Sequence, residues 1–326
     1  MDDAFGVLHR LYGDAGWPSP FHALDALRLI REGMQAAEAA RRAGTTRQRV
    51  ADLVAAGDPI ARVLRVPAAQ IRNDDRAAAK RGLAQILLGR AAELAFEDIY
   101  RTEIGAQEFE LVDLHEGRTD TDYRLLNGRK RPLYRLNIKF TGSIFRRALE
   151  LVGLVPEDCF PLATYKIFNA LKKQEQEHLP YIFLAVFVRT LNVEAIGAYI
   201  PAPYIEFLAW MRRSDRGGLP KRDVEDRAVG QLVADRAQAF ELAYTPIRQA
   251  SWYVLSARKA DILLRRLLFD RVYALKIRGF AQQFGGAELD MHFSLSQDLV
   301  PLTRLFQVLR DEGQTMVASM LERGTI

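Results

Sequence analysis

The stretch Leu133-Tyr-Arg-Leu-Asn-Ile-Lys-Phe140 decides the fold, because it alternates or runs apolar as β-strands do. Two shorter runs precede it, Phe109–Leu114 and Thr121–Leu126, and Asn127-Gly128 is typical of a turn between antiparallel strands. The continuous apolar run Pro180–Val188 predicts a fully buried strand further along the chain. The middle of the chain is therefore expected to form a sheet.

Helical spacing of apolar residues surrounds these strands. It predicts a long helix over 76–103 and shorter helices over 143–152 and 162–177. Beyond residue 190 the pattern is mostly helical. One basic stretch there, 256–279, is expected either to pack as an amphipathic helix or to contact phosphates as a second arm.

Composition limits the class of protein. The chain has 326 residues, of which 49% are hydrophobic and 27% charged, as in ordinary globular proteins. A single cysteine, Cys159, forms neither an internal disulfide nor a thiolate zinc site. Because the start is acidic and no apolar run reaches the length of a membrane span, we expect a cytoplasmic protein without a membrane partner.

Positive charge is concentrated in one segment. The chain carries a net charge of +5, whereas residues 118–147 alone hold nine basic side chains against Asp120 and Asp122. Such a run is either a solvated face or an electrostatic footprint for a polyanion. The segment contains Arg129, Lys130 and Arg131 on the predicted turn, where they are placed to hold a nucleic-acid backbone.

The segment from Met34 to Leu53 contains two helical patterns separated at Gly44, which can take the positive φ of a tight helix-helix turn. It resembles a helix-turn-helix DNA-binding motif. The resemblance implies that the start of the second helix faces the major groove of duplex DNA. The DNA-binding residues expected here are Arg41, Arg42, Thr46, Arg47, Gln48 and Arg49. The alternative is a small bundle used for packing or dimerisation.

A second constellation has the residue types of phosphodiester hydrolysis. Glu93 and Glu97 share one face of the long helix, Asp120 and Asp122 alternate before a strand, and Lys139 ends the following strand. Carboxylate oxygens suit Mg²⁺, and a cation near the attacking water stabilises the transition state. In the alternative interpretation, Lys139 and the two aspartates are only solvated polar residues at the ends of strands.

At these residues the chain resembles the PD-(D/E)XK, or restriction-endonuclease-like, superfamily. Its core has a helix with a glutamate, an aspartate opening the second strand, acid-x-lysine ending the third, then a helix and a buried strand. Carried over, the resemblance implies Mg²⁺ (or Mn²⁺) held by Asp122 and Glu93, with Asp120 as a substitute for Asp122. Lys139 would orient or deprotonate the attacking water, and the Ile138 carbonyl would reach the metal.

The chain departs from this pattern at one position. Asn137 occupies the acidic position of the third strand, so one ligand loses its charge. Either Glu93 and Asp122 hold the cation between them, or the copy is inactive. In some branches the next helix adds a polar residue, for which Tyr165, Lys166 or Gln174 could serve.

The expected fold class is α+β, mostly α overall. The expected domains are a helix-turn-helix bundle (1–66), a restriction-endonuclease-like mixed sheet flanked by helices (67–190) and a mainly helical region (191–326). The resemblance implies a metal-dependent endonuclease of the restriction or phage-defence type that hydrolyses double-stranded DNA as a homodimer. The alternatives are a non-catalytic DNA-binding regulator or accessory subunit on a decayed nuclease fold, and an RNA-directed nuclease.

Overall fold

The computed structural model describes residues 26, 29–30, 33–48, 50–51, 73–104, 109–113, 123–142, 144–189, 191–202, 204–205, 208–209, 221–267, 277–281 and 287–323. The chain divides into two compact units, one of residues 1–90 and 193–243, the other of residues 91–192 and 244–326. Each unit is discontinuous in sequence, whereas the three predicted domains are continuous. Both sheets described below lie in the second unit.

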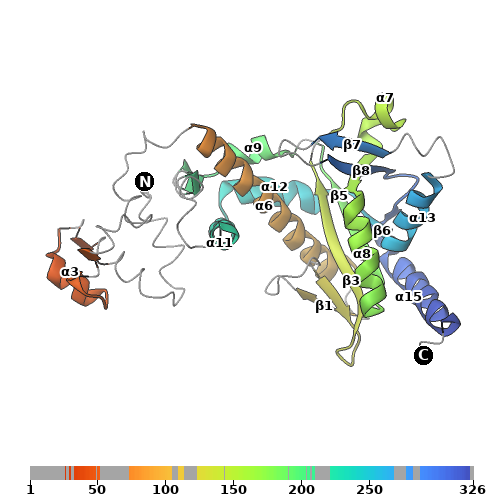
Figure 1. The fold of residues 1–326 in the computed structure, drawn as a ribbon, viewed down its shortest axis with the longest axis horizontal. Helices are drawn as coiled ribbons and strands as arrows, with labels where there is room; N and C mark the ends of the chain where they lie inside the picture. The colour runs from red at the N-terminus through yellow and green to blue at the C-terminus, as the bar shows by residue number, and fades with distance from the viewer. Residues whose placement is uncertain are drawn as a thin grey trace. The chain divides into compact units, whose positions relative to one another are not determined.

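The larger sheet has six strands and is mixed (Figure 1). Its strands, in spatial order, are β1 (Glu110–Asp113), β2 (Tyr123–Leu126), β3 (Pro132–Thr141), β5 (Tyr181–Phe187), β6 (Trp252–Ser256) and β9 (Val300–Pro301). Strands β3 and β5 are parallel, and the other neighbours are antiparallel. The α+β class, the mixed sheet and the four strands expected between residues 109 and 188 are confirmed.

A smaller antiparallel sheet has the order β4 (Cys159–Ala163), β8 (Ala287–Ser294) and β7 (Ile277–Ala281). The described part of the chain after residue 190 is mainly helical, as expected, but it also contains β6, β7, β8 and β9, which the sequence did not predict. Trp252-Tyr-Val-Leu-Ser256 is a short, almost fully buried apolar run. Periodicity alone cannot distinguish such a run from a buried helical segment.

The helices within the described residues are α3 (Ala36–Arg42), α6 (Asn73–Ile99), α7 (Ala148–Val152), α8 (Thr164–Glu177), α9 (Val193–Gly197), α11 (Lys221–Ala234), α12 (Gln238–Gln249), α13 (Ala257–Leu267) and α15 (Leu305–Glu322). A π-helical turn, Tyr100–Ile104, continues α6, so the long helix predicted over 76–103 is confirmed. The helix expected over 143–152 is shorter, and that expected over 162–177 starts at Thr164 because Leu162 and Ala163 end β4. No described helix combines the length and apolarity of a membrane span.

Helix α6 covers one face of the six-stranded sheet, which we call the α6 face. The ring of Phe96 lies 5.8 Å from that of Tyr123 on β2 and 5.9 Å from that of Trp252 on β6, measured between centroids. Phe96 and Tyr123 are fully buried. Leu136 on β3 pairs with Tyr123 and therefore lies on the same face.

Helix α8 covers the opposite face, which we call the α8 face. Ile167 and Ala170 of α8 belong to one buried cluster with Tyr181 and Phe183 of β5. The same cluster includes residues of α13 and of the three-stranded sheet, among them Phe293 of β8. A buried core of the second unit thus lies on the α8 face, beside β3 and β5.

Candidate nucleic-acid interface

Strand β3 directs Arg135, Asn137 and Lys139 to the α8 face. Arg135 fixes this assignment, because its guanidinium is hydrogen-bonded to Glu177 at the end of α8. Side chains alternate along a strand, and β3 keeps a regular register with β5 from Arg135 to Thr141. Asn137 and Lys139 therefore share the face of Arg135.

Two arginines converge on the Glu177 carboxylate. Arg135, only 3% exposed, donates from Nε to Glu177 Oε2 at 2.6 Å and from Nη2 to Oε1. Arg124, its partner residue on β2, approaches the same Oε2 at 3.4 Å with Nη2. The Arg124 side chain is 32% exposed and that of Glu177 33%. One carboxylate thus serves two guanidinium groups.

The remaining β3 positions differ in exposure. Asn137 is buried, with 3% of its surface exposed, and pairs with Phe183 of β5. Lys139 is half-buried and pairs with Ala185. Ile138 lies between them on the α6 face, opposite Leu184. Asn137, whose amide is predicted to replace a metal-binding carboxylate, is therefore buried. Lys139 lies further along β3, near the end of the strand.

Carboxylates gather on the α6 face around the Tyr123 hydroxyl. Tyr123 Oη donates to Glu97 Oε1 at 2.9 Å. Burial raises the pKa of Tyr123 strongly, and the negative charges of Glu97, Glu93 and Asp113 raise it further. Tyr123 is therefore a permanent hydrogen-bond donor, and Glu93 and Asp113 lie near enough to act on it electrostatically. Arg101 neutralises Glu97 at 3.1 Å.

The predicted catalytic residues are thus divided between two faces where they are described. Glu93 belongs to the helix on the α6 face, whereas Asn137 and Lys139 point to the α8 face. The predicted Asp122 and its substitute Asp120 lie outside the described residues. The structure therefore does not bring Glu93 together with Asn137 and Lys139, and the position of Asp122 remains a prediction.

A divalent cation needs several hard oxygen ligands in one place. Within the described parts of the chain, no group of three or more His, Cys, Asp or Glu side chains could hold a metal ion. Asn137 and the Ile138 carbonyl offer neutral oxygens only. The described residues therefore do not form a complete metal site by themselves, and a cation bound beside β3 would need a further carboxylate.

The hairpin between β2 and β3 presents its basic residues to solvent. Arg129, Lys130 and Arg131 are all exposed. Asn127 organises the turn, because its side-chain oxygen accepts hydrogen bonds from the backbone N–H groups of Arg129 and Arg131 at 2.9 and 3.0 Å. Lys130 has a positive φ of 59° and forms an ion pair with Glu110. The turn predicted at Asn127-Gly128 is confirmed.

The Gly44 turn has the local geometry that the sequence predicts. Helix α3 ends at Arg42, Gly44 has φ +66°, and the Thr46 carbonyl accepts from Val50 N at 3.1 Å, which starts a second helical turn. Thr46, Arg47 and Gln48 are exposed, and Val50 is buried with Ala40.

Some of the basic residues predicted to bind DNA in this region already form ion pairs within the protein. Arg41 and Arg42 both pair with Glu38, at 2.6 and 3.3 Å, and their hydrogen bonds hold the pKa of Glu38 below its usual value. Two cations against one anion leave a net positive charge on the exposed side of α3. Arg49 lies outside the described residues, and DNA binding by this segment remains a prediction.

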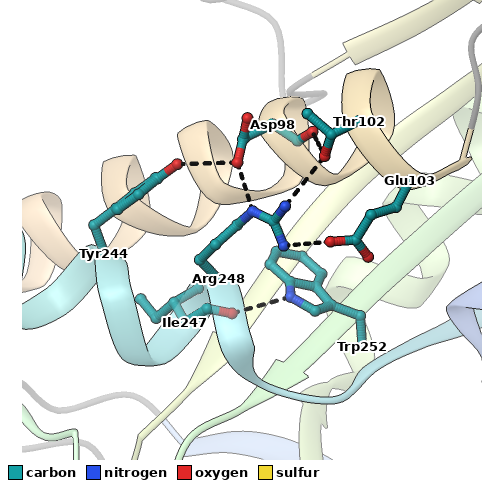
Figure 2. A network of polar contacts seen from close by, with 7 residues as sticks. All are labelled: Asp98, Thr102, Glu103, Tyr244, Ile247, Arg248 and Trp252. Carbon is teal, nitrogen blue, oxygen red and sulfur yellow. Dashed lines mark hydrogen bonds and ion pairs between the residues drawn. The ribbon is translucent and has the colours of Figure 1, made fainter.

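A second polar network joins α12 to the end of α6 (Figure 2). Arg248 donates to Asp98 Oδ2 at 2.5 Å, Glu103 Oε1 at 2.7 Å and Thr102 Oγ1 at 3.1 Å. These bonds lower the pKa of Asp98 and raise that of Arg248. Tyr244 Oη also donates to Asp98, at 3.4 Å. Arg248, unlike Arg124, has more than one carboxylate partner. Its bonds hold α12 against the π-helical turn, and we call this network the Arg248 clamp.

Sequence reasoning missed the role of Glu177 and treated Arg124 and Arg135 only as members of the basic segment. A signal was present, since Arg135 stands between Tyr134 and Leu136 in a run that predicts a buried strand. A charged residue in such a run needs a partner. That partner lies 42 residues away in sequence and could not be identified without the fold.

No protein family, curated protein or solved structure matches this chain in comparisons of its sequence and structure.

Proposed function

We propose that this protein is a Mg²⁺-dependent endonuclease that hydrolyses the phosphodiester bonds of duplex DNA, in restriction or phage defence. The observation that carries the proposal is the order of elements in one mixed sheet: α6, then β1, β2 and β3, then α8 and the buried β5. This is the order that the resemblance to restriction-endonuclease-like enzymes implies. Lys139 stands near the end of the third strand, as in their acid-x-lysine motif.

In this proposal each group has a defined role. Lys139 holds or deprotonates the attacking water, and its positive charge stabilises the charge that develops on the phosphate. Asp122 supplies the carboxylate for Mg²⁺ or Mn²⁺, whereas Glu93 lies on the opposite face of the sheet from Lys139 and is not a ligand in this proposal; the cation, when bound, would polarise the phosphate and lower the pKa of water. Exposed Arg129 and Arg131 contact backbone phosphates, and the Gly44 turn places Arg47 and Gln48 in the major groove.

The proposal is tested by incubating the purified protein with supercoiled plasmid and Mg²⁺ or Mn²⁺. Cleavage should fall by at least about 100-fold in Lys139→Ala, because general acid–base groups contribute factors of that size. Asp122→Ala should abolish it. Lys172→Ala, which removes an exposed lysine from α8, is the matched control and should cut normally. Cleavage that survives both site variants excludes this assignment.

Binding gives an independent test of the nucleic-acid partner. Affinity for duplex DNA should drop steeply between low and physiological salt, because basic side chains displace counterions from phosphates. A flat salt response contradicts the proposal. Cleavage of structured RNA with duplex DNA left intact supports the RNA-directed alternative.

Buried Asn137 favours a second candidate, a DNA-binding regulator or accessory subunit on a nuclease fold that has lost its activity. This candidate predicts specific binding without cleavage. It also predicts that Asn137→Asp gains Mg²⁺-dependent cleavage. Because the new carboxylate is buried, the variant should be destabilised in chelator and stabilised again by Mg²⁺, whereas wild type should respond less.

A further inference from the structure

We propose that Arg124, with Arg135 and Glu177, forms a phosphate-binding subsite for the DNA backbone beside the predicted catalytic strand. The inference deepens the proposed function and rests on it for the identity of the polyanion. It starts from an imbalance of charge. Glu177 meets Arg135 with both oxygens, one of them at 2.6 Å from Nε, and its remaining contact to Arg124 is 3.4 Å long. The formal charges of Arg124, Arg135 and Glu177 therefore sum to about +1.

Arg124 also has unused hydrogen-bonding capacity. Its Nε is buried and has no hydrogen-bond partner among the described residues. A guanidinium carries five N–H donors in a planar fork, and a buried donor is normally satisfied. Nε itself is buried, so a ligand from outside can approach only the exposed part of the side chain, which is 32% exposed as a whole. By contrast, each of the three guanidinium nitrogens of Arg248 donates a hydrogen bond.

A phosphate is the ligand that fits this arrangement best. Phosphate oxygens accept two parallel bonds from a guanidinium fork, and arginine is favoured over lysine for this geometry. The Glu177 carboxylate already occupies one side of Arg124 and shares the acceptor chemistry of a phosphate. It therefore acts as a weak internal competitor, which a polyanion displaces from Arg124 but not from buried Arg135.

The subsite lies on the same face of the sheet as the predicted catalytic lysine. Arg124 is paired with Arg135 on β3, and Lys139 lies four residues further on the same face. Four residues of strand span about 13 Å, a few nucleotides of a DNA strand. Buried Asn137 lies between Arg135 and Lys139, so a bound backbone does not run along the strand itself. Arg129 and Arg131, which are exposed, lie at the other end of β2 and β3.

The experiment compares three variants by fluorescence anisotropy with a labelled duplex over a series of salt concentrations. Arg124→Ala should weaken binding by about 3- to 10-fold and reduce the slope of log affinity against log salt by about one, as expected for one lost phosphate contact. Glu177→Gln should bind more tightly, because it removes the competing charge and keeps the size of the side chain. Arg101→Ala removes an exposed arginine from the α6 face and should change neither quantity.

Thermal melting checks that each variant is folded, and Arg124→Lys provides a variant that keeps the charge without the fork and should recover only part of the affinity. Unchanged affinity and slope in Arg124→Ala, or weaker binding by folded Glu177→Gln, overturns the inference.

A second experiment, with inorganic phosphate, separates this inference from the proposed function. If wild type does not bind duplex DNA, then inorganic phosphate should still raise its melting temperature, and Arg124→Ala should abolish that shift. Such a result keeps the subsite for a free phosphate and rejects the nuclease, whereas no phosphate effect rejects both.

Discussion

The two faces of the six-stranded sheet differ in how their charges are balanced. On the α6 face, carboxylates surround a permanent donor, Tyr123, and the nearby arginines each meet carboxylates at short distance. On the α8 face, Arg124 and Arg135 share one carboxylate, and Lys139 follows on the same strand. Self-sufficient networks stabilise a fold, whereas an arginine that shares its carboxylate with a second arginine can attract an external anion. The charges of the α6 face are therefore balanced by their own neighbours, and we propose that an external anion binds beside Arg124 on the α8 face.

The largest effect should come from truncating the apolar centre of the α6 face. Phe96 is fully buried and contacts the rings of Tyr100, Tyr123 and Trp252. Phe96→Ala should cost about 3–5 kcal/mol of the free energy of unfolding, through lost transfer energy and the cavity left behind. Urea denaturation measures this cost. DNA affinity of the remaining folded protein should be unchanged.

The matched control is Phe168→Ala on α8, where the ring is 55% exposed. It should alter stability by no more than about 0.5 kcal/mol, because little buried area is lost. Similar costs for the two phenylalanines would remove the distinction between a packed α6 face and an accessible outer side of α8.

Much of this fold follows from local patterns. The strands over 109–114, 133–140 and 180–188 and the helix over 76–103 are each specified by the spacing of their own apolar residues. Strand β6 escaped prediction because Trp252–Ser256 is short and runs directly into α13. The strands β4 and β8 are paired although more than 100 residues separate them, so neither carries a turn signal for the other.

The site was harder to predict than the fold, because a face is a property of strand pairing. The sequence places Asn137 and Lys139 on one strand, and the structure agrees. It does not reveal that Glu97 accepts a hydrogen bond from Tyr123, which lies 26 residues away. This contact places the Glu97 side of α6 on the face of the sheet opposite to Asn137 and Lys139. The sequence also contains no sign that Glu177 reaches Arg135. Glu93 and Lys139 have the residue types of one site, and only the strand register and the contacts of α6 show that they lie on different faces.

An intermediate effect should come from the Arg248 clamp on the α6 side. Arg248→Met removes the bonds to Asp98, Thr102 and Glu103 and should cost about 2 kcal/mol at neutral pH, a moderate value because solvent screens both carboxylates. The hydrogen bond from Arg248 holds the pKa of Asp98 below its ordinary value of 3.8. A depressed carboxyl pKa contributes stability above the ordinary value and loses it as the pH falls through the folded value.

The difference in stability between wild type and Arg248→Met should therefore be constant from about pH 7 to pH 5 and shrink below about pH 4. Urea denaturation at several pH values measures it. A difference that grows on acidification contradicts the assignment of Asp98 as the main partner.

The smallest effect should come from the hydrogen bond between the two elements of the α6 face. Tyr123→Phe keeps the buried ring against Phe96 and removes only the donor to Glu97, which retains Arg101 as a partner. The expected cost is about 1 kcal/mol in urea denaturation, the net value of one such bond. Because the lost hydrogen bond lies on the α6 face, the affinity of Tyr123→Phe for duplex DNA should stay within about twofold of wild type. Arg124→Ala should show the reverse pattern, with lower affinity for DNA and unchanged stability. A Tyr123→Phe variant that binds DNA far more weakly than wild type would place the ligand on the α6 face and reverse the assignment of the two sides.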